Sequence, residues 1–251
     1  MEATATELAE YIVDRLANTP TNRRLLIGIS GVPASGKSTI AQLLVNLVNS
    51  FTRPAANPHE PSSQNSSDLA ILVGLDGWHL TRAQLDAFPD PVLAHNRRGA
   101  HWTFDGEAYV NFVRELKKPI QTNAASLKPE EIQNTIIYAP SFSHETKDPI
   151  PNDIAVHPRH RVVIIEGLYT FLSIPPWVEA AKQLDERWWV EVDEEEAERR
   201  LIARHVKTGV AKDLQEAEWR SRENDRPNGR FVKENMLEPT RVIRSIDDPV
   251  L

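Results

Sequence analysis

The residues from Gly31 to Ser38 have the types and the spacing that phosphate binding requires. They read Gly-Val-Pro-Ala-Ser-Gly-Lys-Ser and fit the pattern G-x-x-x-x-G-K-[ST] without a mismatch. The glycines let the backbone turn so tightly that successive N–H groups can point at phosphate oxygens. Lys37 supplies a charge for the β- and γ-phosphates, and the Ser38 hydroxyl suits Mg²⁺. The pattern therefore predicts that ATP and Mg²⁺ bind here, through Gly31, Val32, Pro33, Ala34, Ser35, Gly36, Lys37 and Ser38.

Two acidic residues follow apolar segments elsewhere in the chain. Asp76 ends the run LAILVGLD, and Glu166 ends the run RVVIIE. One such carboxylate can hold magnesium or its waters, while the other orients an attacking hydroxyl group. We assign the base to Asp76, because histidine and aromatic residues follow it, and the metal side to Glu166. The alternative is that each carboxylate only caps a helix or stabilises a turn.

The elements that must position these groups are apolar strands that alternate with helices. We expect strands near 24–30, 69–76, 161–166, 187–193 and 241–246, and helices near 6–17, 38–48 and 106–117. This alternation predicts an α/β fold with a parallel sheet that is covered by helices on both faces. The carboxyl ends of parallel strands meet at one edge, where the site should lie. The stretch 53–68, rich in Pro, Ser and Asn, is expected to be a mobile loop.

A charged region follows the strand near 187–193. We expect one helix at 194–207 and another at 213–222, and together with the residues up to about 230 they would form a lid. Arg200 and Arg204 stand at i, i+4 and so share a helix face. Two guanidinium groups closing over ATP would neutralise charge on the transferred phosphoryl group. In the alternative, Glu195 and Glu196 pair with arginines of the same solvated helix.

The composition limits the class of protein. The chain has 251 residues, a net charge of −7, 40% hydrophobic and 26% charged residues, which is typical of one globular domain. The negative charge disfavours a nucleic-acid partner. The sequence contains no cysteine, which excludes disulfides and thiolate sites. The acidic N-terminal segment and the lack of a long apolar run predict a cytoplasmic protein without membrane attachment.

In this order, six segments resemble the uridine kinase and phosphoribulokinase family of P-loop kinases: GVPASGKST, LDGWHLTR, RRGAHWTFD, YAPSFSHETKDPI, IIEGLYTFL and RRLIARHV. The match is nearest to the nucleoside/nucleotide kinase-like branch and to pantothenate kinases. The resemblance implies ATP with magnesium, an aspartate base at Asp76 and a lid arginine at Arg200 or Arg204. It also implies that Thr39 reaches a phosphate behind Ser38.

The segment that should bind the acceptor differs from that of uridine kinases. Gly77-Trp78-His79 follows the expected base, and the basic, aromatic run 97–102 stands where uridine kinases have an acidic ribose-binding segment. A guanidinium group here would suit an acceptor with a carboxylate or phosphate. Alternatively, Arg98 pairs with Asp105 or Glu166. The residues expected to contact the acceptor are His79, Arg98, Trp102 and Tyr169.

The favoured function is therefore an ATP-dependent kinase that phosphorylates a hydroxyl group of a small molecule such as a sugar, a hydroxy acid or a pantothenate-like compound. A nucleoside kinase of the uridine type is the alternative within this class. A nucleotide-binding regulatory ATPase module without acceptor chemistry is the alternative from another class. The absence of an N-K-x-D motif argues against a GTPase. The sequence does not indicate an oligomeric state.

Overall fold

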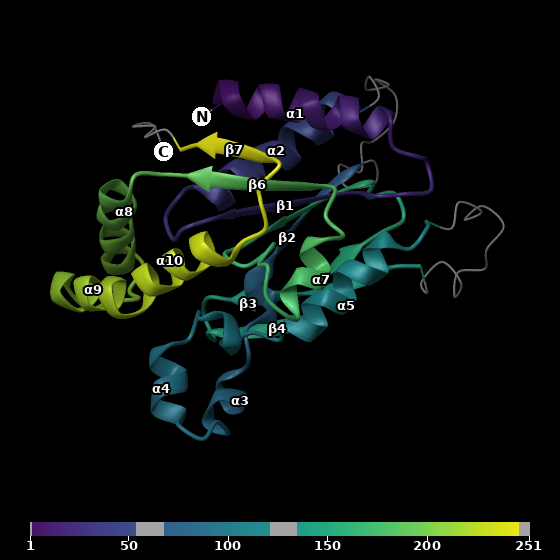
Figure 1. Cartoon of the computed structure of the whole chain (residues 1–251). Coiled ribbons are helices and arrows are strands. Elements are labelled where there is room, and N and C mark those ends of the chain that lie inside the picture. Colours follow the sequence, from purple (N-terminus) through teal and green to yellow (C-terminus); the bar gives the residue numbers. More distant parts are fainter. Residues whose placement is uncertain (1, 54–67, 121–134, 246–251) are drawn as a thin grey trace.

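The computed structural model describes residues 2–53, 68–120 and 135–245, and most of the loop expected at 53–68 lies outside these ranges. Its centre is a sheet of five parallel strands in the order β2–β5–β1–β6–β7 (Figure 1). The strands are β1 (Leu25–Gly31), β2 (Ala70–Gly74), β5 (Val162–Glu166), β6 (Glu186–Glu191) and β7 (Arg241–Arg244). All five expected strands are therefore present, and the predicted parallel α/β fold is confirmed.

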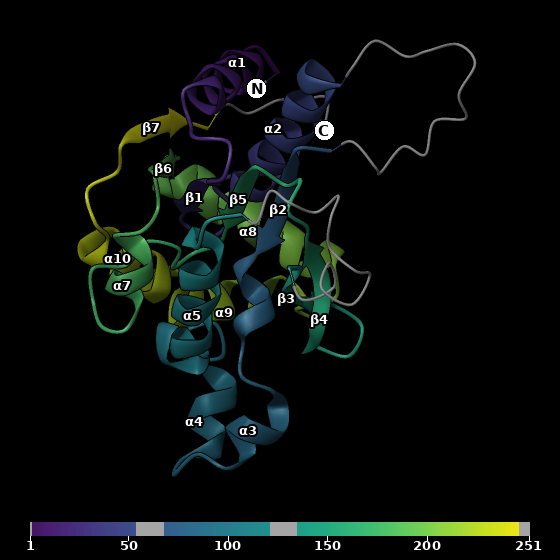
Figure 2. The same cartoon turned by 90° about the vertical axis from the view of Figure 1, so that its right-hand side faces the viewer.

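Helices cover both faces of the sheet, as the apolar strands require. On one face lie α1 (Glu2–Ala17) and α2 (Lys37–Thr52), and on the other lie α5 (Gly106–Lys117) and α7 (Trp177–Ala181) (Figures 1 and 2). Each face encloses its own cluster of buried apolar side chains. β1 and β5 contribute to both clusters, because alternate side chains of a strand point to opposite faces. None of the helices in the described ranges is long and apolar enough to span a membrane.

An antiparallel hairpin, which was not among the five expected strands, lies beside the sheet. It consists of β3 (Ile137–Ser143) and β4 (Asp148–Val156). Several proline residues and exposed positions interrupt its apolar pattern, so period-two alternation was hard to see. Two short helices, α3 (Arg82–Asp86) and α4 (Pro91–Asn96), and the 3-10 turn η2 (His101–Thr103) complete this side. In Figure 1, α3 and α4 project away from the sheet.

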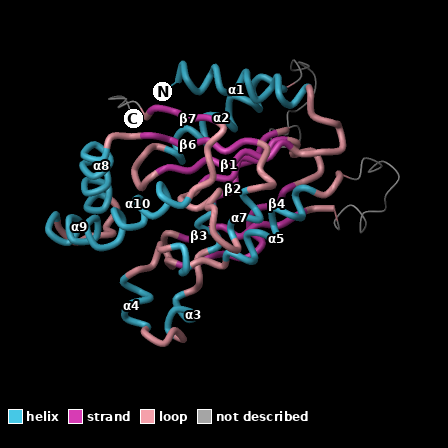
Figure 3. Tube along the Cα trace, viewed as in Figure 1, coloured by secondary structure: helices cyan, strands magenta, loops and turns pink. Residues whose placement is uncertain are grey.

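The C-terminal helices gather at one end of the sheet (Figure 3). They are α8 (Glu194–Lys207), α9 (Leu214–Arg220), the π-helical turn η4 (Ser221–Asp225) and α10 (Arg226–Asn235). Asp193 and Asp213 cap α8 and α9 by accepting hydrogen bonds from backbone N–H groups. The run 219–229 mixes charged residues with turn-forming residues, yet it is helical throughout. Pro227 is compatible with this because it occupies the first turn of α10, where no N–H group is needed.

Candidate active site

The loop between β1 and α2 has the backbone geometry of an anion site. β1 ends at Gly31 and α2 begins at Lys37. Gly36 precedes the helix with φ 90°, a left-handed conformation that glycine adopts without strain, and no side chain caps the helix. The first N–H groups of a helix have no partner within it. At this helix they can therefore bind phosphate oxygens, aided by the positive end of the helix dipole.

Ser38 and Glu166 meet beside this loop. The Ser38 hydroxyl donates a hydrogen bond of 3.0 Å to Glu166 Oε2, although the two residues lie far apart in the chain. Glu166 is the last residue of β5, which pairs with β1. Among the described residues, no group of three or more His, Asp or Glu side chains could hold a metal by itself. One hydroxyl and one carboxylate nevertheless suit Mg²⁺, which commonly takes its other ligands from phosphates and water.

Charges of both signs surround Lys37. Burial lowers the pKa of the Lys37 ammonium group, and the carboxylates of Glu166 and Asp76 act in the opposite direction. Burial raises the pKa of Glu166, while Lys37 lowers it. These mutual effects place the phosphate-loop lysine and both predicted acids in one electrostatic cluster. Two carboxylates and one ammonium group together carry a net negative charge, which a bound metal ion could balance.

Asp76 lies in the 3-10 turn η1 (Leu75–Trp78), immediately after β2. Its side chain is 60% exposed, in contrast to the half-buried Glu166. His79 Nδ1 lies 2.9 Å from the Asp76 carbonyl oxygen and 3.8 Å from its Oδ1. The His79 ring packs against Phe104, with 3.9 Å between ring centroids, and burial lowers the pKa of His79. A neutral His79 therefore lies beside a carboxylate that is open to an incoming hydroxyl group.

The two arginines of α8 have different surroundings. Arg200 donates to Glu196 and, at 2.9 Å, to Ser245 Oγ. This is in part the same-helix pairing that we considered as the alternative. The charge of Arg204 instead lowers the pKa of both Lys37 and Glu166, so this arginine contributes to the electrostatic cluster at the phosphate loop.

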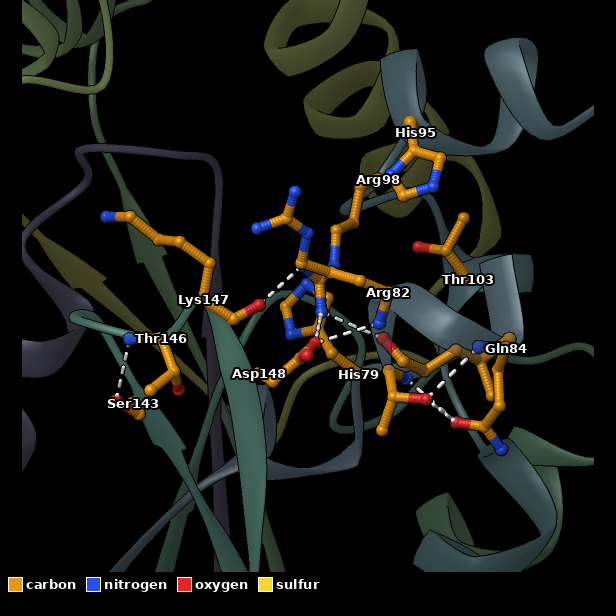
Figure 4. Close-up of polar contacts among 12 residues, drawn as sticks. His79, Arg82, Gln84, His95, Arg98, Thr103, Ser143, Thr146, Lys147 and Asp148 are labelled. Carbon is orange, nitrogen blue, oxygen red and sulfur yellow. Dashed lines mark hydrogen bonds and ion pairs between the residues drawn. The ribbon is translucent and has the colours of Figure 1, made fainter. Parts of the chain in front are cut away.

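Arg98 has protein partners that the sequence analysis did not consider. Its guanidinium group donates to Asp148 Oδ1 at 2.9 Å, to the Leu80 carbonyl at 2.9 Å and to the Lys147 carbonyl (Figure 4). Asp148 also accepts from the Arg82 N–H at 2.9 Å. The alternative in which Arg98 pairs with a protein carboxylate thus describes this conformation, with Asp148 of the hairpin in place of Asp105 or Glu166. Asp148 therefore balances the charge of Arg98.

The other two predicted acceptor residues differ in exposure. Trp102 is 37% exposed and packs against Phe88, with 5.8 Å between ring centroids. Tyr169 is fully buried, and its hydroxyl donates a hydrogen bond of 2.8 Å to the Gly99 carbonyl oxygen. In this conformation Tyr169 supports the chain around Gly99 from within the core and does not line a pocket wall.

Sequence reasoning assigned no role to two acids that the structure places at the site. One is Asp148, described above. The other is Asp225, whose charge acts on Lys37 and whose Oδ2 lies 3.0 Å from His205 Nε2. The only signal in the sequence was the position of Asp225 in the polar run 219–229, since Lys37 and His205 come from two other segments of the chain.

Known proteins similar to this chain are kinases, although no family model matches it. It is 45% identical over 163 residues to the ATP-dependent kinase-like protein notR' of Aspergillus versicolor, covering 65% of this chain and 89% of that protein. It is 34% identical over 224 residues to C227.14 of Schizosaccharomyces pombe, named as a candidate uridine kinase, covering 89% of this chain and 84% of that protein. The chain belongs to the uridine kinase-like family of ATP-dependent P-loop kinases.

Solved structures agree with this assignment. A candidate kinase of a fructose transport system from Silicibacter sp. TM1040 superposes with a TM-score of 0.73 and 26% identity, covering 95% of this chain and 98% of that chain. YFH7 of Saccharomyces cerevisiae shares the fold, with a TM-score of 0.77 and 23% identity, covering 97% of this chain and 99% of that chain. Members of this family use ATP and Mg²⁺, and the phosphate loop, Ser38 and Glu166 provide the groups that both need.

Proposed function

We propose that this kinase transfers the γ-phosphoryl group of ATP to a hydroxyl group of a small molecule, with Asp76 as the base. The observation that carries the proposal is the exposed Asp76 carboxylate within the electrostatic cluster of Lys37 and Glu166. A carboxylate at this position can orient an acceptor hydroxyl towards a phosphoryl group held by the loop. We also propose that the whole chain acts as one kinase domain, with a lid formed by residues 194–230.

The residues would share the reaction as follows. The acceptor oxygen forms a bond to the γ-phosphorus while the bond from that phosphorus to the bridging oxygen of ADP breaks, and the hydroxyl proton passes to Asp76. Lys37 and the N–H groups of the first turn of α2 hold the β- and γ-phosphates. Arg204 neutralises charge that accumulates on the transferred group. Ser38 and Glu166 would hold Mg²⁺, which supplies further neutralisation of the phosphate oxygens.

The acceptor would bind between η1, the segment 97–102 and the hairpin. Because Asp148 already neutralises Arg98, an acceptor needs no negative charge to bind there. Backbone carbonyls, His79 and Trp102 can bind hydroxyl groups or pack against a carbon skeleton. Sugars and other polyhydroxylated compounds, hydroxy acids and pantothenate-like compounds are the classes we propose.

A nucleoside acceptor of the uridine type is the second candidate. It is favoured by the aromatic side chains next to Asp76, since His79 lies 3.9 Å from Phe104 and 5.1 Å from Phe142 between ring centroids. Such rings can stack on a base. The name of the relative C227.14 points in the same direction.

The decisive experiment measures ADP release from Mg·ATP across sugars, hydroxy acids, pantothenate-like compounds and nucleosides. We expect one class to stimulate release, and Asp76→Asn to lower its turnover by roughly 10²–10⁴ with ATP affinity retained. Asp14→Asn, which changes an exposed acid on α1, is the matched control and should have no effect. ATP binding without stimulation by any acceptor would favour a regulatory nucleotide-binding module. If Asp76→Asn instead weakened ATP binding strongly while kcat at saturating ATP stayed unchanged, Asp76 would be the metal ligand.

A further inference from the structure

Helix α10 and the π-helical turn η4 contact both halves of the site. Gly229 faces the phosphate loop so closely that an added Cβ atom would lie 3.3 Å from the Val32 side chain and 3.4 Å from that of Pro33. One residue earlier, Asn228 is buried and faces the opposite half. Adjacent residues of one helix thus touch the nucleotide loop and the segment 97–101, which we call the acceptor segment.

Three contacts join η4 and α10 to the acceptor segment. The Asn224 side-chain amide donates a hydrogen bond of 2.9 Å to the Arg98 carbonyl oxygen. The Arg97 guanidinium group donates to Asn228 Oδ1 at 3.3 Å. The Phe231 ring stacks on His101, with 4.4 Å between centroids and 4° between planes. Two polar contacts and one stacked pair therefore fix the position of this segment against the helix.

Asn224 and Asn228 also hold one another. Asn228 Nδ2 donates to Asn224 Oδ1 at 3.2 Å, so both amides are oriented before they reach the acceptor segment. Gly99 between them has φ +106°, and a Cβ atom there would lie 3.7 Å and 3.8 Å from the two amide nitrogens. Both asparagines lie at or next to a π-helical turn, and such turns are frequent at functional sites.

The acceptor segment in turn contacts the hairpin. The Arg98 side chain binds Asp148 at the start of β4, while its own carbonyl oxygen is held by Asn224. A cavity of about 400 Å³ lies between α8, α10, the end of β6 and the phosphate-loop residues Val32 and Pro33. Helix α10 therefore borders this cavity at the phosphate loop and is tied to the acceptor segment by the contacts described above.

We propose that Asn224 and Asn228 are positioning residues that couple the nucleotide loop to the acceptor segment through α10. Helix α10 already lies against Val32 and Pro33, and phosphates bound by the loop would stabilise this contact, so that the two amides hold residues 97–101 more firmly in place for the acceptor. This inference rests on the proposed function, because it assumes that the loop binds ATP and that the acceptor segment faces the second substrate.

The test measures amide hydrogen exchange in residues 97–101 with and without Mg²⁺ and a non-hydrolysable ATP analogue. In the unmodified protein we expect the analogue to slow exchange about fivefold, which corresponds to one hydrogen bond of about 1 kcal/mol. The double variant Asn224→Ala/Asn228→Ala should lose this protection. Asn235→Ala is the matched control, because this side-chain amide lies on the same helix and donates within it, to the Phe231 carbonyl oxygen. It should keep the protection.

Calorimetric titration with the same analogue, together with circular dichroism, separates the outcomes. Binding and folding that are intact in the double variant, with exchange in 97–101 still slowed, would overturn the coupling. The coupling would also be overturned if the unmodified protein bound the analogue but exchange in residues 97–101 was not slowed. If the unmodified protein did not bind the ATP analogue, the proposed function would be contradicted, and this inference with it. If the double variant does not fold, Asn224→Asp, which keeps the shape and removes the donor, should show the same loss of protection.

A turnover measurement provides the second readout once an acceptor is known from the screen. For the double variant we expect KM for that acceptor to rise about tenfold while KM for ATP changes little. A general structural defect would change both constants or only the amount of active enzyme. Equal changes in both KM values would therefore contradict a positioning role.

Discussion

The nucleotide half and the acceptor half of the site are specified in different ways. In the nucleotide half, Lys37 and Ser38 belong to one unbroken motif, and only Glu166 comes from a distant strand. In the acceptor half, Arg98 is held by residues 18, 50 and 126 positions away in the chain. The nucleotide half is thus encoded mainly by residues that are close in the sequence. The acceptor half forms only when the hairpin and α10 pack against the segment around Arg98. Substitutions in the two halves should consequently have separable kinetic effects.

The largest effect is expected in the nucleotide half, from Lys37→Ala. Loss of the charge that holds the β- and γ-phosphates should lower kcat on the order of a hundredfold or more, as for other preorganised electrostatic groups. Steady-state ADP release with the identified acceptor measures this. Lys182→Ala, which removes an exposed lysine immediately after α7, should change nothing. A Lys37→Ala variant that keeps more than about a tenth of the original kcat would contradict the assignment of the loop.

The lid provides the next test, through its two arginines. Arg204→Ala should lower kcat about tenfold to a hundredfold, because the Arg204 charge acts on the cluster of Lys37 and Glu166. Arg200→Ala should have the smaller effect, since this side chain binds Glu196 and Ser245. Comparing kcat for the two variants makes each a control for the other. A larger loss in Arg200→Ala would show that the lid rearranges on closing and brings Arg200 to the phosphates.

In the acceptor half, Arg98→Ala and Asp148→Asn test whether Arg98 acts by itself or through its partner. If the pair positions the hairpin, each variant should raise KM for the acceptor about tenfold, equal to about 1.4 kcal/mol, with KM for ATP nearly constant. The double variant should then be little worse than either single one. A lower acceptor KM in Asp148→Asn would instead mean that Arg98, once released, binds an anionic acceptor directly.

The contrast between the two halves also explains how much of the fold and of the site could be predicted from the sequence. The five parallel strands, α5, α8 and the convergence of Lys37, Ser38, Glu166 and Asp76 followed from apolar runs and one motif. Parallel strands bring their carboxyl ends together whatever the loops do. The partners of Arg98 did not follow, because the hairpin lacks clear alternation and Asp148 becomes a neighbour only in three dimensions. The helical run 221–235 was obscured by its asparagine, proline and glycine residues.

The smallest expected effect comes from His160, which belongs to neither half. It precedes β5, at the end of the strand opposite to Glu166, and is 5% exposed. Its Nδ1 accepts a hydrogen bond of 3.1 Å from the His157 N–H, which requires an unprotonated nitrogen. Burial, together with smaller effects of the charges of Arg159, His157 and Arg24 and against an opposing effect of Asp68, lowers the pKa of His160 to about 4.

Because the pKa of His160 is lower in the folded than in the unfolded chain, the unfolded chain binds more protons between about pH 4 and 6.5. The contribution of this residue to stability is thus present above about pH 6.5 and is lost as the pH falls towards 4. Between pH 7 and pH 5 the loss is up to about 2 kcal/mol. In His160→Asn, whose oxygen can still accept from His157, urea unfolding should show a correspondingly weaker pH dependence, while kcat and both KM values at pH 7 stay unchanged. An equal pH dependence in the two proteins would mean that folding does not lower the pKa of His160. A changed KM would mean that substitutions at the opposite end of the sheet affect substrate binding.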